Sequence, residues 1–165
     1  MSNNPEIHTP RVNITGPEGN ARIRIGSALP DPVINGESMK RDVVVSGIQI
    51  NDSNGNEIGG MGVIDGTRIG ILALDYGFNE AVGMWSADTA EEKSAGLYVC
   101  DSVGFANGKH ERPYKRIVIA VNEDLPSLVF MGKNGKPRLV IGLDENDNPV
   151  IDILDADGNS KSLIG

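Results

Sequence analysis

The sequence predicts an all-β protein: an antiparallel meander of about six hairpin repeats, or about twelve strands. Two observations lead to this fold class. A turn glycine is followed seven residues later by a closing glycine in four stretches: Val12–Gly26, Gly47–Gly62, Ser127–Gly142 and Val150–Gly165. Apolar residues alternate with others before and after each turn glycine, which is typical of two strands joined by a glycine-containing loop.

The repeat unit is about 23 residues long and can be followed along the whole chain. Asp52 and Asp75 are 23 residues apart, as are Gly132 and Asp155, and a further copy surrounds Asp101. Insertions near 27–46 and 105–113 explain the longer spacings, and residues 1–10 form a polar N-terminal arm. The copy around Asp75 is the least regular, because Trp85 stands where a closing glycine is expected. We therefore expect a single hairpin-repeat domain over residues 1–165.

The composition agrees with many short strands. The 165 residues are enough for one domain with a core, and 21 glycines and 9 prolines suit frequent turns. Only seven residues are Phe, Tyr or Trp. The core is therefore expected to consist of Ile, Val and Leu, which favour strands.

Three arrangements of the hairpins are open to such a chain. Twist accumulates over twelve strands and open edges invite aggregation, so we expect the meander to roll into a barrel-like form. The closing glycines favour this curvature. The runs Ile117–Ile119 and Leu139–Ile141 are apolar on both faces, which indicates burial on two sides by rolling or by a partner chain. A β-trefoil and an open hairpin solenoid are the alternatives.

Two stretches carry a resemblance. The segments GNEIGGMGVIDG and GKPRLVIGLDENDNPVIDILDADGNSK resemble a group of uncharacterised bacterial proteins with D-x-x-G-x-x-R-L-x-L-G hairpins, and similar stretches occur in phage tail-associated proteins. The resemblance covers Gly47–Asp75 and Ser127–Gly165 best. It implies hairpin geometry and no particular chemistry.

The charge and the start of the chain limit the partners. A formal net charge of −8 disfavours nucleic acid, because phosphate would be repelled. No signal peptide and no membrane-spanning apolar run is recognisable, so a cytoplasmic location without a membrane partner is expected. With one cysteine, Cys100, and two histidines, the chain is poorly supplied for a disulfide or a transition-metal site, and we expect no cofactor.

Large side chains gather in the irregular copy. Tyr76, Phe78, Met84 and Trp85 could line an apolar pocket for a small molecule at a barrel mouth. The alternative is that they plug the core or form a subunit contact. The insertion FANGKHERPYKR adds a cluster of positive charge in which Arg112 could bind an anionic ligand, although a solvated loop explains the same residues.

The catalytic candidates are few. If the protein is an enzyme, Asp75, Tyr76, His110, Glu111 and Tyr114 are the residues that could exchange protons or orient a substrate. No nucleophile signature such as G-x-S-x-G accompanies them. Enzymatic activity is therefore left open, and its absence is favoured.

Two acidic loops near the end of the chain raise the question of calcium. Asp144, Asp147, Asp155 and Asp157 supply hard oxygen ligands in tight turns. Neither loop completes an EF-hand, and Asp, Asn and Gly are also the residues that hairpin turns require. We therefore expect turn chemistry, with calcium as the alternative.

Two classes of function remain. The regular geometry and the thin catalytic inventory favour a non-catalytic structural or interaction module that forms a homo-oligomer or binds a protein partner. The alternative is a small β-barrel that binds an apolar small molecule and acts on it as a cyclase or isomerase, since an acid in a shaped apolar cavity can be sufficient.

Overall fold

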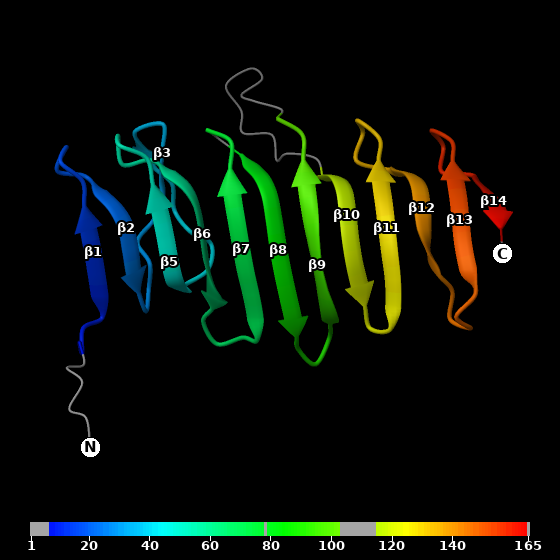
Figure 1. The fold of residues 1–165 in the computed structure, drawn as a ribbon, viewed down its shortest axis with the longest axis horizontal. Coiled ribbons are helices and arrows are strands. Elements are labelled where there is room, and N and C mark those ends of the chain that lie inside the picture. The colour runs from blue at the N-terminus through cyan, green and yellow to red at the C-terminus, as the bar shows by residue number, and fades with distance from the viewer. Residues whose placement is uncertain (1–6, 78, 103–114, 165) are drawn as a thin grey trace.

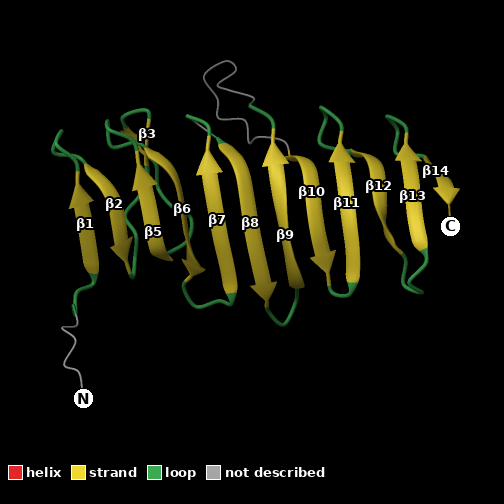
Figure 2. Ribbon diagram, in the orientation of Figure 1, coloured by secondary structure: helices red, strands yellow, loops and turns green. Residues whose placement is uncertain are grey.

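The computed structural model describes residues 7–77, 79–102 and 115–164, and these form one twelve-stranded antiparallel sheet whose strands follow one another in chain order (Figure 1; Figure 2). The strands of the sheet are β1 (Arg11–Thr15), β2 (Ala21–Gly26), β5 (Val45–Asn51), β6 (Glu57–Ile64), β7 (Ile69–Asp75), β8 (Glu80–Asp88), β9 (Lys93–Cys100), β10 (Lys115–Asn122), β11 (Leu125–Met131), β12 (Pro137–Leu143), β13 (Pro149–Leu154) and β14 (Ser160–Ile164). The short strands β3 (Val33–Ile34) and β4 (Glu37–Ser38) pair with each other. The predicted all-β meander of six hairpins is confirmed. No helix that could cross a membrane occurs in the described part of the chain.

The sheet is open, so the predicted rolling into a barrel is wrong, and the trefoil alternative is also not observed. The strands β1 and β14 lie at opposite ends of the sheet (Figure 1). Closing a barrel requires a stagger that accumulates from strand to strand. Here directly paired residues run from Val12 in β1 to Ile164 in β14 without leaving the strands, so little stagger accumulates. The ends therefore do not meet, and extensive contacts join only neighbouring strands of the sheet.

Five of the hairpin loops share one construction. In the β5–β6 loop the N–H of Asp52 donates to the carbonyl of Asn56, and the N–H of Gly55 donates to the carbonyl of Asp52. The fourth residue of this loop, Gly55, has a φ of 86°, which glycine adopts without steric cost. The same pair of hydrogen bonds closes the loops that begin at Gly16, Gly132, Asp144 and Asp155. The turn glycines of the repeat therefore occupy the positions for which they were predicted.

The closing positions of the repeats fall in a single row across the sheet. Following the paired residues from each strand to the next, the row contains Gly26, Gly62, Trp85, Ala120 and Gly142. Trp85 therefore does stand at a closing position. A Cβ at Gly62 would lie 2.5 Å from the carbonyl oxygen of Ser46. The glycine is needed because the neighbouring backbone approaches this closely.

The two faces of the sheet differ. Successive side chains of a strand point to opposite faces, and directly paired residues share a face. Two rows of paired residues on one side, which we name the apolar face, contain no charged residue and run from β1 to β13. The first row is Val12, Ile25, Ile48, Met61, Leu72, Met84, Leu97, Ile119, Leu128, Ile141 and Ile151, and the second is Ile14, Ile23, Ile50, Gly59, Leu74, Val82, Val99, Ile117, Phe130, Leu139 and Ile153.

The opposite side, which we name the insertion face, carries residues 27–44. This insertion contains β3 and β4 and is held to the sheet by the N–H of Leu29, which donates to the carbonyl of Val45 over 2.8 Å. The buried hydrophobic residues of the described chain are Leu29, Val45, Ala87, Cys100 and Ala120. Leu29 belongs to the insertion, and by the strand alternation the other four point to the insertion face. The small core therefore lies on this side, and the apolar face contributes nothing to it.

The row of closing positions gives a testable prediction about packing. The change Gly62→Ala places a Cβ against backbone that cannot move away cheaply, and we expect a loss of about 2 kcal/mol in the free energy of unfolding. In the neighbouring strand, a Cβ at Gly70 would meet only the Ser86 hydroxyl, at 3.1 Å. Gly70→Ala is therefore the matched control and should stay within about 0.5 kcal/mol of the parent in urea unfolding. Equal losses in the two variants would contradict the argument.

Candidate functional site

The predicted site residues are only partly brought together. Asp75 and Tyr76, at the end of β7, both line a cavity on the insertion face. Met84 and Trp85 are neighbours in β8 whose side chains point to opposite faces. Both line a second hollow across β8 to β12, which Tyr76 does not line. The remaining candidates lie outside the described residues: Phe78, His110, Glu111, Arg112 and Tyr114.

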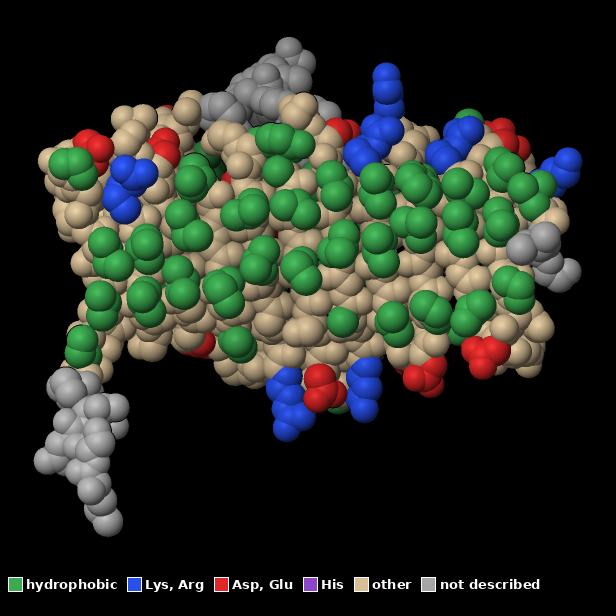
Figure 3. Space-filling view, viewed as in Figure 1, with side chains coloured by type: hydrophobic (Ala, Val, Ile, Leu, Met, Phe, Trp, Pro, Cys, Tyr) green, Lys and Arg blue, Asp and Glu red, His purple; other side chains and the backbone are tan. Residues whose placement is uncertain are grey.

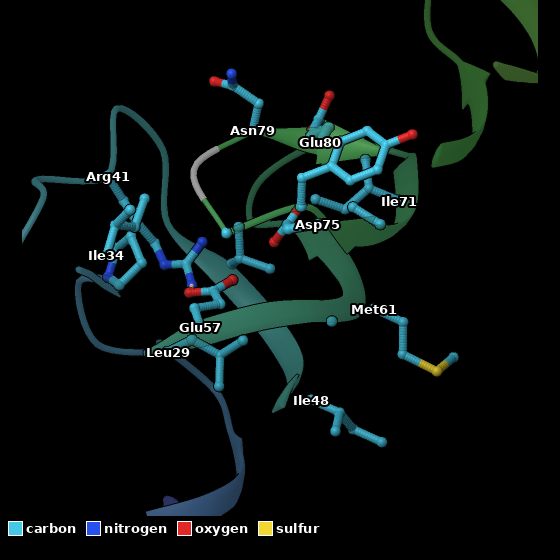
Figure 4. A pocket seen from close by; sticks show the side chains of 16 residues that line it. Leu29, Ile34, Arg41, Ile48, Glu57, Met61, Ile71, Asp75, Asn79 and Glu80 are labelled. Atoms are coloured by element: carbon cyan, nitrogen blue, oxygen red, sulfur yellow. Dashed lines mark hydrogen bonds and ion pairs between the residues drawn. The ribbon is translucent and has the colours of Figure 1, made fainter. Parts of the chain in front are cut away.

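The cavity has a volume of about 240 Å³ and is formed where the insertion covers the sheet. Leu29, Ile34 and Arg41 line it from the insertion, and Glu57, Ile71 and Asp75 line it from β6 and β7 (Figure 4). The Arg41 side chain fixes the insertion. Its Nε donates to the carbonyl of Pro30 over 2.9 Å, and its terminal nitrogen lies 2.6 Å from Oε2 of Glu57.

Acidic groups dominate the polar part of the cavity. Glu57, Asp75 and Glu80 all line it, and Figure 4 shows Arg41, Glu57 and Asp75 on the same side of the sheet. Burial raises the pKa of Asp75 to about 6, and the negative charges of Glu57 and Glu80 add to this rise, while Arg41 opposes it. Asp75 is therefore a carboxyl group that changes its charge close to neutral pH.

Aromatic residues lie beside the cavity, on β8 and β9. Tyr98 donates its hydroxyl hydrogen to Oε2 of Glu80 over 2.8 Å, and burial together with this bond raises the pKa of Tyr98. The rings of Trp85 and Tyr98 are 6.0 Å apart, and the Lys115 ammonium lies 4.4 Å from the Tyr98 ring centroid. A Cβ on Gly96 would lie 2.5 Å from the Trp85 ring, so a glycine opposite Trp85 makes room for the indole. The Trp85 indole therefore packs over Gly96 and beside the Tyr98 ring.

The aspartates that begin the two acidic loops accept hydrogen bonds within their own turns. Oδ1 of Asp155 accepts hydrogen bonds from the backbone N–H groups of Asp157 and Asn159, and Asp144 accepts the equivalent bonds from Asn146 and Asn148. Side-chain bonds from Asn148 and Asn159, followed by these backbone bonds, lower the pKa of Asp144 and Asp155. The proposed calcium ligands Asp144 and Asp147 lie in the β12–β13 loop, whereas Asp155 and Asp157 lie in the β13–β14 loop at the other end of β13. Within the described ranges, no group of three His, Cys, Asp or Glu residues could hold a metal ion.

The largest feature of the surface is the apolar face, which the sequence reasoning did not find. Figure 3 shows hydrophobic side chains in bands along the whole length of the sheet, with charged side chains towards its two long borders. More than a third of the surface is exposed in many members of the two rows: Val12, Ile14, Ile25, Ile50, Met61, Leu74, Met84, Val99, Ile119, Ile141 and Ile153. The signal was present in the sequence, because apolar residues recur at the same place in each 23-residue unit.

Comparison with protein-family models, with characterised proteins and with solved structures finds no match to this chain. The chemistry of the two surfaces must therefore be judged from their residues. Besides carboxylates, the described residues that line the cavity offer Tyr76 as a group that could exchange a proton, and they include no Ser, Thr, Cys, His or Lys. The two rows of the apolar face consist of aliphatic, methionine, phenylalanine and glycine residues, which offer contact surface.

The pKa of Asp75 leads to a prediction about stability. Folded Asp75 holds its proton more tightly than unfolded Asp75 does. The stabilisation that this tighter proton binding gives to the folded state is complete below about pH 4, and it is lost as the pH rises through about 6. Asp75→Asn keeps the side chain neutral, so at pH 7.5 the variant should be more stable than the parent by about 1–2 kcal/mol, a range reduced for partial solvent exposure.

Urea unfolding at pH 4 and at pH 7.5 measures this difference. The advantage of Asp75→Asn should be near zero at pH 4. The exposed Asp42 of the insertion provides the control, since Asp42→Asn should show the same small effect at both pH values. An Asp75→Asn advantage that is as large at pH 4 as at pH 7.5 would show that charge is not its cause.

Proposed function

We propose that this protein is a non-catalytic interaction module that assembles through the apolar face of its sheet. The observation that carries the proposal is the pair of unbroken apolar rows, which cross eleven strands without one charged side chain. Contiguous exposed apolar surface of this extent is unusual on a monomeric protein and is typical of an interaction site.

The number of layers in the fold supports the same conclusion. A stable domain normally has at least two packed layers that share a core. Because this sheet has one layer with a short insertion on one side, a second layer from another molecule would complete it.

The alternative of an apolar small-molecule site has weaker support. An open sheet has no lumen in which such a ligand could be enclosed. The cavity beneath the insertion is about 240 Å³, below the range of about 300–1,000 Å³ that is common for ligand pockets. The carboxylates of Glu57, Asp75 and Glu80 border this space, so an apolar ligand there would lie against groups that prefer water.

The proposal is tested by placing one charge on each face. Ile119 lies on the apolar face and is 47% exposed, and Leu125 lies on the insertion side and is 39% exposed. In sedimentation velocity, the parent and Leu125→Glu should sediment as species heavier than one chain, because the apolar face is intact in both. Ile119→Glu should sediment as a single chain of 17.5 kDa with an unchanged far-ultraviolet spectrum.

Oxidation by peroxide gives an independent measurement. Met61 and Met84 lie in the first apolar row and are 52% and 51% exposed in the isolated chain. In the assembled protein they should be oxidised more slowly than in Ile119→Glu. A parent protein that sediments as one chain, with Met61 and Met84 oxidised as fast as in that variant, would refute the proposed function.

A further inference from the structure

We infer that the apolar face is covered by a second copy of this chain, and that the two sheets pack face to face as a two-layer sandwich with twofold symmetry. This inference rests on the proposed function and adds the identity of the partner and its stoichiometry. Three properties of the face support it: its area, its charge and its regular spacing.

The area is sufficient for a stable dimer. Strands are about 4.8 Å apart and alternate side chains of a strand about 7 Å apart, so two rows over eleven strands cover about 700 Å². Two copies would bury about 1,400 Å² in total, which lies within the range of about 1,200–2,000 Å² for specific, stable interfaces. The third line of paired residues on this face adds to it at several strands, for example with Val63, Val121 and Leu143.

The charge distribution permits two copies to meet. Each chain has a formal net charge of −8, so contact through a charged surface would be opposed. The two apolar rows hold no charge, and the charged side chains in Figure 3 lie towards the long borders of the face. A dimer through this face would therefore bury no unpaired charge, and its charged residues would form a solvated rim.

The regular spacing makes the face complementary to itself. In a twofold dimer the same patch faces its own copy, so a surface must fit itself. Rows about 7 Å apart form parallel ridges with grooves between them, and the ridges of one sheet can enter the grooves of an identical sheet. Sheets packed in this way lie about 10 Å apart, which aliphatic side chains of the size of Ile, Leu and Met can fill.

The other surfaces suit a second copy less well. Addition of a strand to the free edges of β1 or β14 would lengthen the sheet and leave the apolar face in water. The insertion face carries Arg24, Glu80, Lys115 and Asp152, together with the insertion, so two such faces could not approach closely. On the apolar face, a second layer would meet neither an inserted segment nor a charged residue in the two rows.

The test exploits the central position of Met84. The strand β8 lies near the middle of the sheet, so a twofold axis through the centre brings the two copies of Met84 near each other. Met84→Glu alone and Met84→Lys alone should each be a single chain in solution, because like charges would meet in an apolar contact. An equimolar mixture of the two variants should restore a species of two chains, since the opposite charges then pair.

Leu125→Glu and Leu125→Lys, on the opposite side, are the matched controls, and each should remain a two-chain species by itself. Light scattering of the parent and of every variant gives the masses. The parent could instead form assemblies of three or more chains, or assemblies without a fixed number of chains, that the Ile119→Glu change dissociates. That result would overturn the twofold sandwich and leave the proposed function standing. A mixture of Met84→Glu and Met84→Lys that stays single-chain would also overturn the sandwich, while a single-chain parent would refute both.

Discussion

The structure depends on one constraint: the antiparallel register aligns corresponding residues of successive hairpins across the sheet. Because side chains alternate with a period of two, a shift by one residue in any hairpin would move its apolar residues to the other face. Each repeat instead places an aliphatic side chain beside that of its neighbour, as at Met61, Leu72 and Met84. The five loops that share one construction and the row of closing positions both help to maintain this register.

Much of the fold could be predicted from the sequence, because the features that determine a hairpin are local. Gly55 and Gly158 mark loops that need a positive φ, and the repeat spacing alone places Trp85 at a closing position, where it pairs with Ile71. The choice between a rolled and an open sheet was predicted wrongly, since it depends on how stagger adds up over twelve strands. No single repeat contains that information.

The candidate site was less predictable for a related reason. Asp75 and Tyr76 both line the cavity, which forms only because residues 27–44, the segment between β2 and β5, fold over the sheet. The ion pair of Arg41 with Glu57 joins residues 16 apart and follows no motif. Met84 and Trp85 were placed together because they are adjacent, although adjacency in a strand separates their side chains. The insertion also makes the two faces chemically different, so an assembly can use one face and keep the other in solvent.

The way in which strands contact only their neighbours has a consequence for how such a chain can change over evolution. Each hairpin is held by the one before it and the one after it, so a copy could be duplicated or deleted without disturbing distant residues. The length of the sheet would then follow the number of copies in the gene. The local stability of the hairpins would also vary along the sheet, because the outermost hairpins have one neighbour and the central ones have two. Fraying from the free ends towards the middle is the natural unfolding route of this architecture.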